Sequence, residues 1–222
     1  MFQWLAGGDM GVKTEKLLSI LTLQPVIPVL AVESVATAIP LARALVAGGL
    51  KAIEITLRTE AALDAIRAVA DEVEGAEVGS GTILNAAQFE QAMRAGSKFI
   101  VTPGTTQELL EVSRKAPVPL LPGAATVSEV MSLREEGYSV MKFFPAEQSG
   151  GAAFLKSVSS PLAGTSFCPT GGISPENAKS YLSLPNVVCV GGSWVAPKEL
   201  VTAGDWKAIT RLAEDACALT AS

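Results

Sequence analysis

The chain has 222 residues, of which 49% are hydrophobic and 18% are charged, and its formal net charge is −5. This length suits one domain with a sizeable core, and the negative charge argues against a nucleic-acid partner or an acidic membrane partner. Histidine is absent. Its absence excludes Ser-His-Asp and Cys-His catalysis and removes the usual catalytic ligand of zinc. No apolar run is long enough to span a bilayer.

The first residues, 1–12, read MFQWLAGGDMGV and lack the basic segment of a signal peptide. We expect them to form a loosely ordered tail, followed by a helix over about residues 13–22. Two of the three cysteines, Cys168 and Cys189, lie in apolar runs, whereas Cys217 lies near the C-terminus. This pattern suits reduced, buried thiols, so we expect a cytoplasmic protein.

From residue 25 onward, short apolar runs alternate with segments of helical periodicity. The runs are PVIPVLAV (25–32), LKAIEITL (50–57), AEVGSGTI (76–83), KFIVTPG (98–104), VPLLPGAA (118–125), SVMKFFPA (139–146), TSFCPTGG (165–172) and NVVCVGGSW (186–194). Eight strands alternating with helices predict an α/β fold of the (β/α)8 type, the TIM barrel. The prediction is one catalytic domain over residues 13–222, with an extra N-terminal helix.

Local signals support these boundaries. Thr105 with Glu108, and Thr126 with Glu129, fit capping boxes, and Ser174 followed by proline fits a helix start. A doubly wound open sheet is the alternative fold, but it requires a glycine fingerprint after the first strand, and PVIPVLAV has none. The segment VGSGT (78–82) is interpreted as a tight turn where the backbone approaches a ligand.

Lys142 occupies an unusual place within the apolar run SVMKFFPA. A buried ammonium is costly unless it is paired or loses its proton, and the alternative is a lysine at a strand end that reaches water. Side chains alternate along a strand, so Glu54 and Lys142 are expected on the inner face of the barrel, with Arg58 at the strand end. A buried ion pair is one interpretation. A catalytic pair is the other, because TIM-barrel active sites lie at the C-terminal ends of the strands.

Glycine clusters end the last two strands, at Gly171-Gly172 and at Gly191-Gly192-Ser193. Loops in these positions often bind phosphate, because glycine lets backbone N–H groups approach an anion. Two ordinary turns are the alternative interpretation.

A neutral lysine amine can attack a ketone, and the resulting Schiff base allows the carbon–carbon bond one position further along to break. Glu54 can transfer the protons and Arg58 can hold a carboxylate. The residues therefore indicate a keto acid with a distal phosphate as substrate.

The segments EITLRTE (54–60), VGSGTIL (78–84), KFFPAE (142–147), CPTGGISPEN (168–177) and GGSW (191–194) closely resemble the bacterial 2-keto-3-deoxy-6-phosphogluconate (KDPG) aldolases, which also act on 4-hydroxy-2-oxoglutarate (KHG). The resemblance covers the chain from about residue 13. It implies a class I aldolase of the Entner–Doudoroff pathway that forms homotrimers and needs no metal or cofactor. The resemblance implies that Lys142 is the Schiff-base lysine and that Glu54 is the general acid–base residue. Arg58, Thr82 and Pro103 would contact the pyruvate part of the substrate, and Phe144 would pack near the imine. The residues that would line the distal phosphate end are Thr170, Gly171, Gly172, Gly192 and Ser193.

Three other functions stay open from the sequence. One is an aldolase for the 6-phosphogalactonate epimer, which differs at one hydroxyl. Another is a phosphosugar isomerase or epimerase barrel that uses Glu54 as base and leaves Lys142 without a covalent role. The third is a non-catalytic barrel that only binds a phosphorylated keto acid. A product assay separates the last two from an aldolase.

Overall fold

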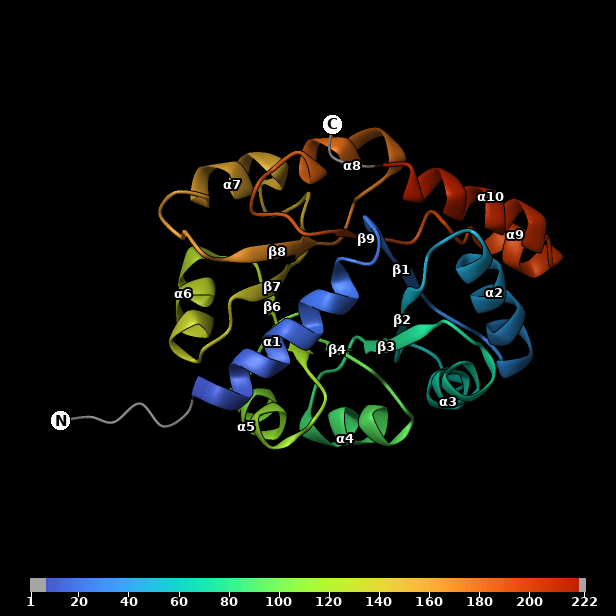
Figure 1. Cartoon of the computed structure of the whole chain (residues 1–222), viewed down its shortest axis with the longest axis horizontal. Helices are drawn as coiled ribbons and strands as arrows, with labels where there is room; N and C mark the ends of the chain where they lie inside the picture. The colour runs from blue at the N-terminus through green and yellow to red at the C-terminus, as the bar shows by residue number, and fades with distance from the viewer. Residues whose placement is uncertain (1–6, 220–222) are drawn as a thin grey trace.

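The structure, a computed structural model, describes residues 7–219, over which strands and helices alternate as predicted (Figure 1). The strands are β1 (Val26–Leu30), β2 (Ala52–Thr56), β3 (Glu77–Gly81), β4 (Ile100–Val101), β5 (Leu120–Leu121), β6 (Gly123–Ala124), β7 (Val140–Phe143), β8 (Ser166–Pro169) and β9 (Val190–Gly192). The helices are α1 (Gly7–Leu21), α2 (Val35–Ala47), α3 (Ala62–Glu72), α4 (Ala86–Arg94), α5 (Gln107–Lys115), α6 (Val127–Glu135), α7 (Gly151–Val158), α8 (Pro175–Leu182), α9 (Lys198–Ala203) and α10 (Trp206–Cys217).

The strands form two parallel ladders, ordered β5-β4-β3-β2-β1-β9 and β6-β7-β8. Only Pro122 lies between β5 and β6. Proline has no N–H to continue a ladder, which explains why the fifth predicted strand is split. Isolated parallel bridges, Phe167 with Val187 and Thr170 with Gly191, join β8 to the segment around β9. The result is an α/β fold with a curled parallel sheet, whose longest ladder spans six strands.

Successive side chains of a strand face two different cores. Ile53 and Ile55 of β2 belong to the large core between sheet and surrounding helices, whereas Ala52 faces an inner cluster. This alternation is the one predicted from the sequence. The buried members of the inner cluster are Leu17, Ile20, Leu21, Ile27, Ala52, Phe99, Val101, Leu121, Val140, Cys168 and Cys189.

Helix α1 supplies three members of that inner cluster and lies across the strands in Figure 1. It packs where the strands begin, so it covers the N-terminal end of the curled sheet. The helix starts at Gly7 instead of near residue 13, which corrects the predicted boundary and takes residues 7–12 out of the predicted tail. Residues 1–6 of that tail lie outside the described residues.

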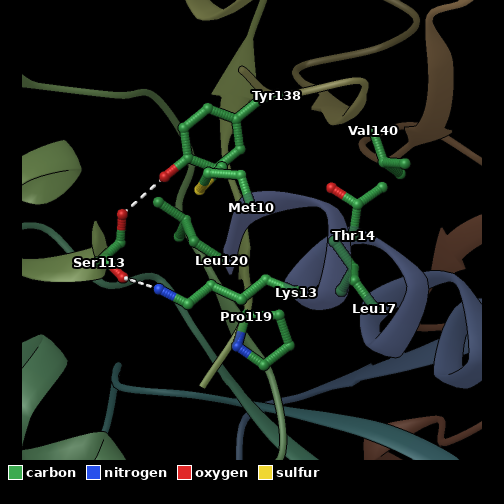
Figure 2. A pocket seen from close by; sticks show the side chains of 9 residues that line it. All are labelled: Met10, Lys13, Thr14, Leu17, Ser113, Pro119, Leu120, Tyr138 and Val140. Carbon is green, nitrogen blue, oxygen red and sulfur yellow. Dashed lines mark hydrogen bonds between the residues drawn. The ribbon is translucent and has the colours of Figure 1, made fainter. Parts of the chain in front are cut away.

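A second buried lysine fixes α1 to the rest of the fold (Figure 2). Lys13 Nζ donates to the main-chain oxygens of Ser113, at 3.2 Å, and of Arg114, at 2.9 Å. The hydroxyl groups of Ser113 and Tyr138 are 2.6 Å apart, and burial raises the pKa of Tyr138. The cavity that these side chains line has a volume of only about 10 Å³.

Helix starts agree with the predicted caps at two of three places. The capping box of Thr126 and Glu129 is confirmed, and α8 begins at Pro175 after Ser174. The predicted cap at Thr105 is wrong, because Thr106 accepts a hydrogen bond from Leu109 N and is the N-cap of α5. The Thr105 hydroxyl instead donates to the main-chain oxygen of Gly123.

Candidate active site

Lys142 of β7 and Glu54 of β2 meet on the inner face of the curled sheet. Lys142 Nζ lies 3.5 Å from Glu54 Oε1 and 5.2 Å from the centroid of the Phe144 ring. The two residues are only 4% and 3% exposed, so the alternative of a lysine reaching water is wrong. Their predicted inward orientation is confirmed. The pair combines an amine, which can act as a nucleophile, with a carboxylate that can accept its proton.

Strand β3 leaves room for the Glu54 carboxylate. A Cβ atom at Gly81 would overlap that carboxylate, and one at Gly79 would lie 2.5 Å from the Phe99 ring. Both glycines lie within β3 rather than in a turn, so the interpretation of VGSGT as a tight turn is wrong. The segment does bring backbone close to a functional group, but that group is Glu54 of the neighbouring strand.

Two buried thiols lie beside the pair. Cys168 of β8 pairs with Lys142 in the strand register, and Cys189 is fully buried. The pKa of Cys189 is raised well above its usual value by its hydrogen bond with Cys168, by burial and by the negative charge of Glu54. The Cys189 thiol is therefore neutral at physiological pH.

The residues expected at the pyruvate end follow the ends of β2, β3 and β4. Arg58 Nε donates to Thr56 Oγ1 at 2.9 Å, and the rest of its exposed guanidinium extends past the strand end. Thr82 has a φ of +58°, the only positive value for a non-glycine among residues 7–219. This conformation is a genuine outlier for a β-branched residue and is typical of functional sites. Pro103 packs against Gly123, which pairs with Lys142.

The residues expected at the phosphate end follow β8 and β9. Gly171 and Gly172 have φ values of +103° and +74°, which a residue with a side chain rarely adopts. Thr170 lies against Gly191, so a Cβ there would overlap its hydroxyl, and the Trp194 ring occupies the corresponding space at Gly192. Ser193 is exposed. These loops therefore present backbone groups that close packing holds in place.

A cavity of about 830 Å³ lies at the same end of the sheet. Arg58 and Ser193 both line it, so the structure brings the expected carboxylate-binding and phosphate-binding regions to one opening. Lys142 and Glu54 are not among its lining residues. Both residues are almost completely covered by their surroundings.

Sequence reasoning missed three residues of this region. Gly81 lies in the segment interpreted as a turn, although a glycine next to an inward-pointing carboxylate indicates that the backbone leaves space for that group. Trp194 belongs to the motif GGSW but has no role in the sequence interpretation, and in the structure its ring packs on Gly192. Glu147, in the motif KFFPAE, likewise has no predicted role, and it accepts a hydrogen bond from Tyr181.

Among residues 7–219, no three His, Cys, Asp or Glu side chains are grouped so that they could hold a metal ion. Over the same part of the chain, every helix is too short or too polar to cross a bilayer.

The chain was compared with known proteins. The family model described as KDPG and KHG aldolase matches residues 17–212. A 2-dehydro-3-deoxy-phosphogluconate aldolase of Pseudoalteromonas atlantica is 52% identical over 194 residues, covering 87% of this chain and 90% of the relative.

Two solved structures share the fold and much of the sequence. A KDPG aldolase of Legionella pneumophila, with pyruvate captured as a covalent carbinolamine, has a TM-score of 0.88 and 42% identity, and the match covers 90% of this chain and 97% of that one. The enzyme of Zymomonas mobilis, with 3-phosphoglycerate, has a TM-score of 0.88 and 46% identity, with 94% and 98% covered. The protein described here belongs to the KDPG and KHG aldolase family.

Proposed function

We propose that this protein is a Schiff-base aldolase that cleaves KDPG into pyruvate and glyceraldehyde 3-phosphate. By the same chemistry it cleaves KHG into pyruvate and glyoxylate. The observation that carries this proposal is the buried pair of Lys142 and Glu54, with 3.5 Å between amine and carboxylate. Family membership supports both substrates, and the carbinolamine in the Legionella relative supports a covalent route.

The reaction begins with proton transfer within the pair. Two buried charges cost more than two buried neutral groups unless their attraction is strong, so passing the ammonium proton to Glu54 is a feasible step in this site. The neutral amine of Lys142 then attacks C2 of the keto acid. Loss of water from the carbinolamine gives the imine, with Glu54 supplying and accepting the protons.

Cleavage uses the imine as an electron sink. Glu54, directly or through one water molecule, takes the C4 hydroxyl proton, and the C3–C4 bond breaks to release glyceraldehyde 3-phosphate. The enamine that remains on Lys142 is protonated at C3, and hydrolysis frees pyruvate. None of these steps needs a metal ion, because the protonated imine stabilises the developing negative charge.

The two ends of the substrate are assigned to the two groups of strand-end residues. Arg58, Thr82 and Pro103 hold the pyruvate part, and Phe144 packs beside the imine. Thr170, Gly171, Gly172, Gly192 and Ser193 receive the phosphate. The shared opening of Arg58 and Ser193 supports this arrangement, as does the phosphorylated ligand of the Zymomonas relative.

The proposal also covers the closure of the barrel, the oligomeric state and the cellular setting of the protein. Residues 7–219 form one catalytic domain, in which β5 and β6 count as one position of a closed eight-stranded barrel. The bridges beyond β8 support that closure. The chain acts as a homotrimer, and the exposed side chains of Val127 and Met131 on α6 give an apolar surface for contact between copies. Its free cysteines support a reducing, cytoplasmic setting.

The test is reductive trapping. The purified protein is incubated with pyruvate and borohydride, and its mass is measured by mass spectrometry. An added pyruvate mass, with release of pyruvate from KDPG in a product assay, is the expected result. An isomerase or epimerase would release no pyruvate, and a binding protein would give no turnover. Loss of turnover on adding EDTA, restored by a divalent metal, would contradict the Schiff-base route.

A further inference from the structure

The loop after β7 and the loop after β8 are joined to each other along their backbones. Ala146 N donates to Thr170 O at 2.8 Å, and Glu147 N donates to Gly171 O at 3.1 Å. The first loop follows the strand that carries Lys142, and the second contains the glycines assigned to the phosphate. The positions of the two loops are therefore fixed relative to each other by main-chain hydrogen bonds.

The side chain of Glu147 extends this junction. A Cβ at Gly172 would lie 2.6 Å from Glu147 Cγ, so the acidic side chain packs directly on that glycine. Its Oε1 accepts a hydrogen bond from the hydroxyl of Tyr181, a fully buried residue of α8. The pKa of Tyr181 is raised by burial, by this hydrogen bond and by the negative charge of Glu147.

Helix α8 holds the second loop from its other side. Asn177 Nδ2 donates to Gly172 O at 2.9 Å, and its Oδ1 accepts from Ser174 N at 2.8 Å. Gly172 thus lies between Asn177 and Glu147, both of which are fixed to α8. The loop is held in its shape before any anion arrives, and preorganisation of this kind strengthens binding.

A carboxylate so close to a phosphate loop is unexpected, because like charges repel. The hydrogen bond from Tyr181 gives the Glu147 carboxylate a fixed partner and orientation. The position of Glu147 is therefore explained by what it supports and not by direct contact with the anion.

We propose that Glu147 and Tyr181 are positioning residues, which lock the loop after Lys142 to the Gly171–Gly172 loop and thereby set the preference for a phosphorylated substrate. This proposal rests on the function proposed above. Neither residue touches the reacting atoms, and both act through the placement of Gly172.

The experiment compares the only two tyrosines of the chain. Tyr181→Phe removes the hydroxyl at Glu147, and the matched control Tyr138→Phe removes a buried hydroxyl from the opposite end of the sheet. Both variants are assayed for kcat and KM with KDPG and with KHG, and for trapping with pyruvate and borohydride. For Tyr181→Phe we expect KM for KDPG to rise about tenfold, the effect of one hydrogen bond worth about 1.4 kcal/mol. We expect kcat, KM for KHG and trapping to change less than twofold.

Substitutions of Glu147 give a second, independent test on an exposed residue. Glu147→Gln keeps an acceptor for the Tyr181 hydroxyl and should keep KM for KDPG within twofold of the wild type. Glu147→Ala removes the acceptor and should reproduce the effect of Tyr181→Phe. The double variant of Glu147→Ala with Tyr181→Phe should be no worse than either single variant, because one interaction is lost in all three.

The proposal is overturned if KM for the two substrates changes equally, if neither changes, or if Tyr138→Phe has the same effect. It is also overturned if Glu147→Gln is as damaging as Glu147→Ala. Failure of the proposed function itself looks different, because the wild type would then show neither pyruvate release nor trapping.

Discussion

Two buried lysines occupy opposite ends of the curled sheet, and they have almost the same exposure. Lys13 is 8% exposed at the N-terminal end, and Lys142 is 4% exposed towards the C-terminal ends of the strands. Lys13 donates to two main-chain oxygens, which hold an ammonium but do not take its proton. Lys142 faces the carboxylate of Glu54, which can take a proton and return it.

The space near the two lysines differs. The cavity beside Lys13 has a volume of about 10 Å³, whereas the end of β1 and Arg58, which follows the strand of Glu54, border one of about 830 Å³. Burial alone therefore does not identify a reactive lysine. Room for a substrate distinguishes the end at Lys142 from the end at Lys13, and the following predictions test that distinction.

The largest expected effect is the difference in activity between variants that lack the Lys142 amine and a variant that lacks the Lys13 amine. Lys142→Ala should lose turnover and trapping completely, and Lys142→Arg should lose both as well, since a guanidinium stays protonated. Lys13→Met should keep both, because its amine has no role in the reaction. Peptide mass spectrometry after reduction with pyruvate and borohydride should place the added mass on Lys142 in the wild type. Added mass on Lys13, or on any other lysine, would contradict the mechanism.

Glu54→Gln tests the carboxylate partner of Lys142. It keeps the shape of the side chain but cannot accept a proton, so kcat with KDPG should fall by about 10²–10⁴-fold. Slow trapping with pyruvate should remain, because Lys142 is still present. A variant with wild-type kcat would show that Glu54 only pairs with Lys142 as a buried ion.

Lys13→Met should act on stability instead. It leaves the main-chain oxygens of Ser113, which is buried, and of Arg114, which is partly buried, without this donor. The loss costs about 1–3 kcal/mol in free energy of unfolding. For a chain of this length the expected fall in Tm is about 2–12 °C. Calorimetry measures it, with Lys16→Met, an exposed position on the same helix, as control. Equal Tm values for the two variants would mean that Lys13 does not fix α1.

The smallest expected effect is on how the stability of the fold depends on pH, and it involves Tyr138 and Tyr181, which lie at opposite ends of the sheet. The pKa values of Tyr138 and Tyr181 are both raised in the folded state. Their contribution to stability is therefore present below the unfolded pKa of about 10 and is lost as pH rises through the folded pKa. Urea unfolding between about pH 8 and pH 11 should show a shallower loss of stability for Tyr181→Phe than for the wild type. Tyr138→Phe should lie between the two, since no carboxylate adds to the shift of Tyr138. A steeper loss in either variant would reverse the sign of the argument.

The parts of the site that were predictable depend on local periodicity. The alternation of side chains along LKAIEITL and SVMKFFPA placed Glu54 and Lys142 inward, because that alternation is a property of each strand alone. Their distance of 3.5 Å depends on the register of strands that are far apart in the sequence. Strand positions were likewise predictable from apolar runs. The break at Pro122 was readable in principle, since proline interrupts a ladder.

The remaining features arise only from tertiary packing. The clearance at Gly81 exists because β2 and β3 are neighbours, and the hydrogen bond of Glu147 with Tyr181 joins residues 34 apart in sequence. Thr82 was assigned only through the family resemblance, because a positive φ at threonine contradicts its local preference.

The position of α1 also bears on the route by which substrate would enter the proposed site and products would leave it. The helix fills the inner cluster from the N-terminal end, so in the proposed reaction substrate and products would share the opening at the other end. Lys142 is buried and Ser193 is exposed, so a substrate held between them as proposed would have its phosphate outermost. In the proposed reaction the half that breaks away is then also the half nearest the exit. Glyceraldehyde 3-phosphate leaves first, while pyruvate is still attached to the lysine behind it, and the departure of the first product opens the path for the water that releases the second.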